Sequence, residues 1–97
     1  MPQEGDYVCV RSESQGVVWG TLVWRIGREC RLKDARQQYE WTKSALTLFD
    51  VVTSDPQKTG LRLSVVVPEI DMTEVCGVIL VPAHMIEKFT SHPPTGV

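Results

Sequence analysis

Aromatic and basic side chains are interspersed through residues 19–43, and this stretch is the strongest candidate for a functional site in the sequence. Aromatic rings stack on nucleobases, and guanidinium groups bind phosphates through paired hydrogen bonds. The aromatic members are Trp19, Trp24, Tyr39 and Trp41, and the basic members are Arg25, Arg28, Arg31, Lys33, Arg36 and Lys43. This composition favours a site for a nucleotide or a short single strand.

Six of these residues are the candidate ligand contacts. We expect Arg36, Lys33 and Arg25 to hold phosphates, and Trp19, Tyr39 and Trp41 to stack on bases. The alternative interpretation is a sheet with its tryptophans in the core and its arginines on a solvated face. Strand parity favours the core for Trp24, which shares a strand face with Leu22 and Ile26, and the surface or an interface for Trp19.

A change of parity within this stretch singles out Arg36. Apolar residues occupy even positions through Leu32 and odd positions from Ala35 onwards. Such a switch requires a bulge or break near Asp34 and Ala35, and bulges often redirect side chains at binding sites. Arg36 directly follows the predicted bulge, so it is the best single candidate for a ligand contact.

Other kinds of chemistry find little support. The two histidines, His84 and His92, have no cysteine or carboxylate neighbours at metal-ligand spacing. The sequence has no Gly-x-Ser-x-Gly motif and no glycine-rich phosphate loop followed by lysine. We therefore expect no catalytic residue, no metal and no cofactor, and a protein that is not an enzyme.

The charge distribution limits the kind of partner. The 97 residues carry a formal net charge of -2, yet residues 25–43 hold six basic and three acidic residues, a local charge of +3. A small basic patch on an acidic chain suits one small anion better than duplex DNA or a membrane surface. The longest apolar run, residues 78–83, is far shorter than the roughly 20 residues that span a bilayer.

The cysteines and the N-terminus favour a reducing compartment. Cys9, Cys30 and Cys76 form no C-x-x-C pair, and each lies in an apolar run, so we expect buried, reduced thiols. The N-terminus lacks the layout of a signal peptide. We expect the protein in the cytoplasm.

The pattern of apolar residues and turn formers predicts an α+β fold with a mainly antiparallel sheet of about five strands and two short helices. Ser44 is a good N-cap for the first helix, and Pro82 suits the first turn of the second. Strands are expected at 7–11, 17–26, 30–41, 61–67 and 74–81, helices at 45–52 and 82–89, a loop at 55–60 and a turn at 68–71. Gly20 marks a bulge or a close approach of two backbones. Residues 1–91 would form one domain and 92–97 a flexible tail.

Several segments together resemble a family of small bacteriophage and prophage proteins, over about residues 6–87. The segments are 16–22, 32–36 with Trp41, 46–49, 67–70 and 73–75, of which Lys-Asp-Ala-Arg and Val-Pro-Glu-Ile are the most specific. The family pattern has more aromatic character around residues 37–39 than this chain. Some small oligomeric phage proteins of similar size sequester cyclic-nucleotide or cyclic-ADP-ribose signals, as Thoeris and CBASS anti-defence proteins do.

The resulting hypothesis is a phage-encoded, non-enzymatic sponge for a nucleotide-derived immune signal in the host cytoplasm. A chain this short buries only about 60–65% of its unfolded surface, so we expect a homo-oligomer with ligand bound between subunits. Two alternatives remain open. One is a protein–protein inhibitor or accessory factor with an exposed apolar sheet edge, and the other is a single-stranded nucleic-acid-binding protein.

Overall fold

Six antiparallel strands and several short helices make up the described part of the protein, and the predicted α+β class is confirmed. The computed structural model describes residues 2–40 and 47–94. The strands are β1 (Tyr7–Ser12), β2 (Gly16–Ile26), β3 (Glu29–Glu40), β4 (Arg62–Leu63), β5 (Val67–Met72) and β6 (Val75–Leu80). Their order is β4-β3-β2-β1-β6, and β5 pairs with the free edge of β3.

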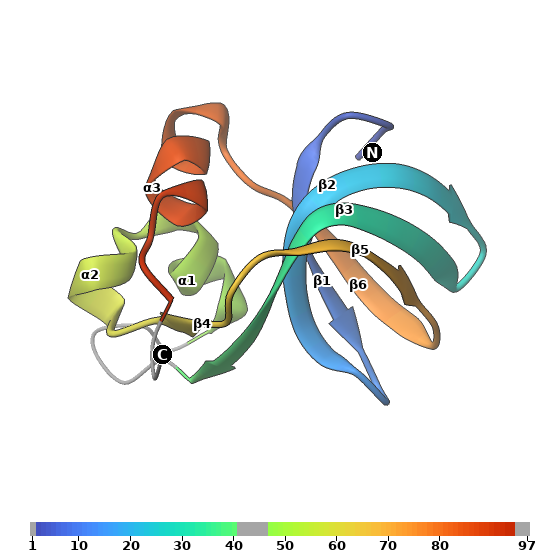
Figure 1. Cartoon of the computed structure of the whole chain (residues 1–97), viewed down its shortest axis with the longest axis horizontal. Coiled ribbons are helices and arrows are strands. Elements are labelled where there is room, and N and C mark those ends of the chain that lie inside the picture. Colours follow the sequence, from blue (N-terminus) through green and yellow to red (C-terminus); the bar gives the residue numbers. More distant parts are fainter. Residues whose placement is uncertain (1, 41–46, 95–97) are drawn as a thin grey trace.

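Helices cover one part of this sheet, as Figure 1 shows on the left of the molecule. They are α1 (Leu48–Thr53), α2 (Pro56–Thr59), a 3-10 turn (Ala83–Met85) and α3 (Ile86–Thr90). No helix in residues 2–40 and 47–94 is long and apolar enough to cross a membrane.

The two faces of the sheet bury two separate apolar clusters. On the inner face, where the strands curl in Figure 1, side chains from β1, β2, β3, β5 and β6 pack together. The outer face is covered by the helices, and there Cys9 and Trp19 of the sheet pack with Phe89 of α3. Alternation along β1 sends Val8 and Val10 inward and Tyr7 and Cys9 outward, as the two-residue period of a strand requires.

The predicted bulge in the third strand is confirmed at Asp34. Trp19 pairs with Arg36 and Thr21 with Lys33, so Gly20 alone lies opposite Asp34 and Ala35. Asp34 has φ of +51°. A Cβ on Gly20 would lie 3.0 Å from the Lys33 carbonyl oxygen, which confirms the predicted close approach. The bulge turns Arg36 onto the outer face.

The segment after the first helix departs from the predictions. We expected a strand at 61–67 and a turn at 68–71, but β4 is only two residues long and residues 67–72 form β5. Pro68 is tolerated because, among the described residues, β5 pairs with β3 alone, so the other edge of β5 needs no N–H donor from this residue. The expected loop at 55–60 contains α2, which begins with Pro56 behind the capping side chain of Asp55.

The first helix begins later than predicted. Thr47 caps it in a capping box with Asp50. The predicted cap, Ser44, lies outside the described residues, as does the start of the predicted helix. The last strand and the last helix follow the predictions closely, with Met85 and Phe89 buried. His92, in the predicted tail, places its Nε2 atom 2.8 Å from the Leu61 carbonyl oxygen.

Candidate functional site

A cavity of about 460 Å³ lies beside the β3 bulge. Its walls come from β2, β3, β5 and the link between β4 and β5. The lining residues are Gln15, Val18, Ala35, Arg36, Gln37, Ser64, Val65, Val67 and Ile70. Because its size lies within the usual range for small-molecule sites and its walls are mainly apolar, we call it the valine pocket.

The valine pocket is held in shape by hydrogen bonds between β3 and the β4–β5 link. The Ser64 N–H donates to the Gln37 carbonyl oxygen at 2.9 Å, and the Gln37 N–H donates to Ser64 Oγ at 2.9 Å. The Gln37 side-chain amide donates to the Gln15 carbonyl oxygen at 3.1 Å. These bonds hold the link against β3, and Val65 of the link and Val67 of β5 line the cavity.

Arg36 is the predicted ligand contact that lines this pocket. Its side chain is only 3% exposed, its Nε–H donates to the Ser64 carbonyl oxygen at 3.0 Å, and Nη1 donates to the Phe89 carbonyl oxygen at 2.8 Å. Burial lowers the pKa of the guanidinium below its usual value, although arginine stays charged at neutral pH. Within residues 2–40 and 47–94, the guanidinium forms no ion pair.

A second hollow of about 290 Å³ adjoins the outer face of the sheet, and Arg36 lines it too. The other lining residues are Tyr7, Thr21, Asp34, Val66 and Thr90. This tyrosine pocket is the more polar of the two. Burial raises the pKa of Tyr7 to about 12, partly offset by the charge of Arg36, so the phenol is neutral at physiological pH.

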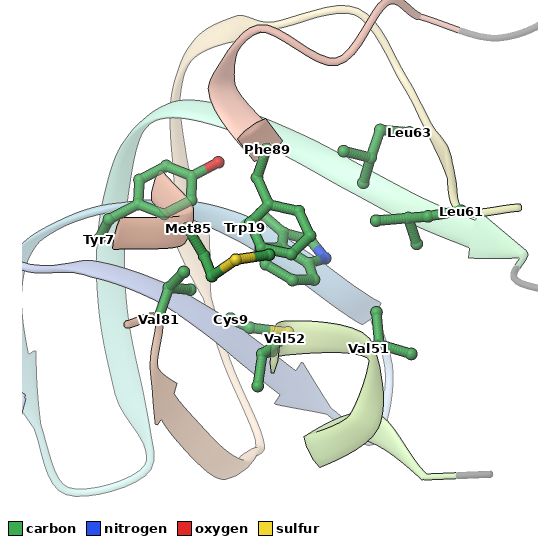
Figure 2. Packing of buried hydrophobic residues seen from close by; sticks show 10 residues of the cluster. All are labelled: Tyr7, Cys9, Trp19, Val51, Val52, Leu61, Leu63, Val81, Met85 and Phe89. Atoms are coloured by element: carbon green, nitrogen blue, oxygen red, sulfur yellow. The ribbon is translucent and has the colours of Figure 1, made fainter. Parts of the chain in front are cut away.

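Trp19 is a core residue, so the expectation that it lies at the surface or an interface is wrong. It is 0% exposed, its ring lies 4.4 Å from that of Phe89, and its Nε1–H donates to Gln38 Oε1 at 2.8 Å. Figure 2 shows the two overlapping rings amid the outer-face cluster. The parity argument failed because α3 covers this face of the sheet. With its ring enclosed, Trp19 has no open face for a base.

Trp24, the predicted core tryptophan, is half-buried instead. A register shift between Leu22 and Trp24 breaks the alternation on which that prediction depended. The Arg31 guanidinium carbon lies 5.8 Å from the centre of the Trp24 ring.

Carboxylates lie opposite three of the six basic residues of this stretch. Arg31 donates two hydrogen bonds to the Asp71 carboxylate, the Nη2–Oδ2 bond being 3.0 Å long, and Arg28 Nη2 lies 3.6 Å from Glu13 Oε2. This pairing raises the pKa of Arg31 and lowers that of Asp71. Lys33 is exposed and pairs in register with Glu69. The local charge of +3 is therefore largely offset by β5, which lies 40 residues further along the chain.

The other predicted contacts do not converge on either pocket. Arg25 is exposed at the far end of β2, Tyr39 is 53% exposed on β3, and Trp41 lies outside the described residues. Among the five candidates that the structure describes, Arg36 alone lines one of these two pockets. The valines at 65–67 went unrecognised as lining residues, although three consecutive valines before a proline break strand alternation and could have signalled an exposed apolar link.

The cysteines follow the prediction in part. Cys9 and Cys30 are buried, and burial raises the pKa of both thiols. Cys76 is exposed on β6, contrary to expectation, because its side chain points away from the inner cluster. The residues that the structure describes contain no group of three histidine, cysteine or acidic side chains that could hold a metal ion.

Fold and site together define a small α+β protein with a ligand-sized, largely apolar pocket beside a strand bulge. The chain belongs to the family described as "Domain of unknown function (DUF6948)", which matches residues 5–89. The match covers every strand, the whole valine pocket and every lining residue of the tyrosine pocket except Thr90. No curated protein and no solved structure matches the chain.

Proposed function

We propose that this protein is a non-enzymatic binding protein that sequesters a nucleotide-derived signal, with the valine pocket taking a base. The observation that carries the proposal is the valine pocket itself, a mainly apolar cavity of about 460 Å³ that the buried residue Arg36 also lines. Apolar walls with a few placed polar groups are typical of small-molecule sites.

The groups around the pocket support a planar, polar-edged ligand. Val18, Val65 and Val67 offer apolar contact to the faces of a base. Gln37 uses one amide N–H for the Gln15 carbonyl oxygen, so its other N–H and its carbonyl oxygen are available to a base edge. The charge of Arg36 favours a ligand that carries phosphate.

The phage origin, the anti-defence role and the host-cytoplasmic location belong to the same proposal and rest on the resemblance of the sequence. The homo-oligomer is also part of this proposal. Val65, Val66 and Val67 are all exposed beside the pocket, and a second subunit on this rim would enclose a ligand. Mass measurement in solution by light scattering, with and without ligand, tests the oligomer.

The decisive experiment incubates the full chain with a panel of cyclic dinucleotides and ADP-ribose isomers. The proposal expects one member to co-purify with the protein and to return intact after denaturation. A Val65→Glu variant places a carboxylate at the rim and should lose that ligand. Ile26→Glu makes the same change at an exposed position of β2 outside the pocket and should retain it. If the whole panel passes through the protein unretained, or returns chemically altered, the sponge proposal fails.

An inhibitor or accessory factor that binds another protein is the second candidate. The exposed valines at 65–67 and Leu80 on the edge strand β6 favour it. Pull-down from a host lysate separates the two, because an inhibitor captures one protein stoichiometrically while a sponge retains a small molecule. Single-strand binding receives less support, since Arg28 and Arg31 already pair with carboxylates. Salt-dependent binding to oligonucleotides would be its signature.

A further inference from the structure

The Tyr7 hydroxyl is an unpaired polar atom inside the protein. The residue is 6% exposed, and its Oη atom is the one buried side-chain polar atom of the described residues that has no hydrogen-bond partner. Leaving a buried hydroxyl unpaired is costly, so such atoms call for an explanation. Tyr7 lines the tyrosine pocket, and a ligand bound there could supply the missing hydrogen-bond partner.

Arg36 brings an unmatched positive charge to the same pocket. A guanidinium has five N–H donors, and the two hydrogen bonds of Arg36 go to backbone carbonyl oxygens. No carboxylate of the described residues forms an ion pair with it. A buried cation without a counter-ion is unfavourable, and an anionic ligand would relieve this.

The remaining lining residues define which anion fits. Thr21 and Thr90 offer hydroxyls, which donate or accept, and the Asp34 carboxylate accepts only. Lys33 lies in register with Thr21 on the same face, and Glu69 lies in register with Lys33 on its other side. An anion bound here must therefore accept hydrogen bonds from Arg36 and Tyr7 and also tolerate Asp34.

We propose that the tyrosine pocket binds a phosphate group, with Tyr7 and Arg36 donating hydrogen bonds to its oxygens and Asp34 accepting a hydrogen bond from its P–OH group. Inorganic phosphate keeps at least one proton at neutral pH, and a phosphate monoester keeps its last proton in part of the population, since the pKa of that proton is about 6. Sulfate carries none and would meet the Asp34 carboxylate without a hydrogen bond between them. The pocket should therefore prefer phosphate to sulfate.

Titration of the full chain with inorganic phosphate and with sulfate, followed by calorimetry in a phosphate-free buffer at pH 6.5, tests the proposal. We expect saturable phosphate binding that is at least several-fold tighter than sulfate binding. Tyr7→Phe should weaken phosphate binding about tenfold, because a hydrogen bond to a charged group is lost. Tyr39→Phe removes the other tyrosine hydroxyl, on a residue outside the pocket, and should leave binding unchanged.

Thermal melting without phosphate provides the second readout. Because the Tyr7 hydroxyl has no partner in the free protein, Tyr7→Phe should melt at the same or a higher temperature. If the hydroxyl had a purely structural role, Tyr7→Phe would melt at a lower temperature than wild type. Asp34→Asn should reduce the preference for phosphate over sulfate, since an amide can donate to either anion.

Three results would overturn the phosphate site: no saturable binding, equal binding by wild type and Tyr7→Phe, or no preference between the two anions. None of them touches the proposed base pocket, which Val65→Glu tests separately. Conversely, if no nucleotide of the panel is retained but phosphate still binds, the sponge proposal fails and the phosphate site is supported.

Discussion

The rings of Trp19 and Phe89 lie 4.4 Å apart with 31° between their planes, and this contact joins the centre of the sheet to the last helix. The Arg36 guanidinium reinforces it by donating to the Phe89 carbonyl oxygen. Phe89 therefore holds α3 to the sheet through both its side chain and its backbone. The shape of the tyrosine pocket depends on this anchor, because Thr90 comes directly after Phe89.

Removing the Phe89 ring should destabilise the protein strongly. Phe89→Ala leaves a cavity against Trp19, for which about 3–5 kcal/mol of unfolding free energy is typical. Chemical denaturation followed by circular dichroism measures the loss. Phe49, the other phenylalanine, is 69% exposed. Phe49→Ala should therefore cost far less, and equal losses in the two variants would contradict the observed packing.

A methyl group at Gly20 should strain the bulge. The added Cβ of Gly20→Ala would lie 3.0 Å from the Lys33 carbonyl oxygen and 3.1 Å from Leu32 Cβ. Because the first neighbour is backbone, we expect a loss of about 1–3 kcal/mol, typical of overpacking. The matched control is Gly77→Ala on β6, where the new Cβ has no neighbour within 4 Å. It should be neutral or slightly stabilising.

Loss of the Asp71 carboxylate should lower stability only where that carboxylate is ionised. The hydrogen bond from Arg31 lowers the pKa of Asp71 in the folded protein. Its contribution is therefore complete above the unfolded-state pKa of about 3.9 and disappears as the pH falls through the lower folded-state pKa. Asp71→Asn should melt below wild type at pH 7, and the two curves should converge on acidification.

Glu4→Gln is the control for this pH series. Glu4 is exposed and forms no ion pair among the described residues. Its melting temperature should follow that of wild type throughout. A gap between Asp71→Asn and wild type that widens toward pH 3 would show that the Arg31 pairing has the opposite effect.

The three thiols should differ sharply in reactivity. Cys76 is exposed, whereas Cys9 and Cys30 are buried with raised pKa values and little thiolate. With a disulfide reagent at pH 8, we expect one equivalent to react rapidly in the native protein and three after denaturation. Cys76→Ser should abolish the rapid phase. Two rapid equivalents in the wild type would mean that one of the inner cysteines is accessible.

Local sequence alone determined several elements, without any contribution from tertiary contacts. The shift of apolar parity between Leu32 and Ala35 predicts the bulge, because a strand has a strict two-residue period and only an extra residue can reverse it. The β-branched run at 75–80 predicts β6, and Pro82 predicts the following helical turn. The same bulge drew attention to Arg36, which lines both pockets.

Tertiary structure decided the burial of Trp19, the charge of the basic stretch and the make-up of the tyrosine pocket. Each of these depends on a segment distant in the chain. Trp19 is buried since α3, 70 residues later, covers its face of the sheet, and parity along β2 carries no information about that cover. The basic stretch loses most of its net charge because β5 places Asp71 and Glu69 opposite it. Tyr7 and Arg36 share one hollow only because β1, β3 and α3 meet there, so the chemistry proposed for that hollow arises from the packing and not from any motif.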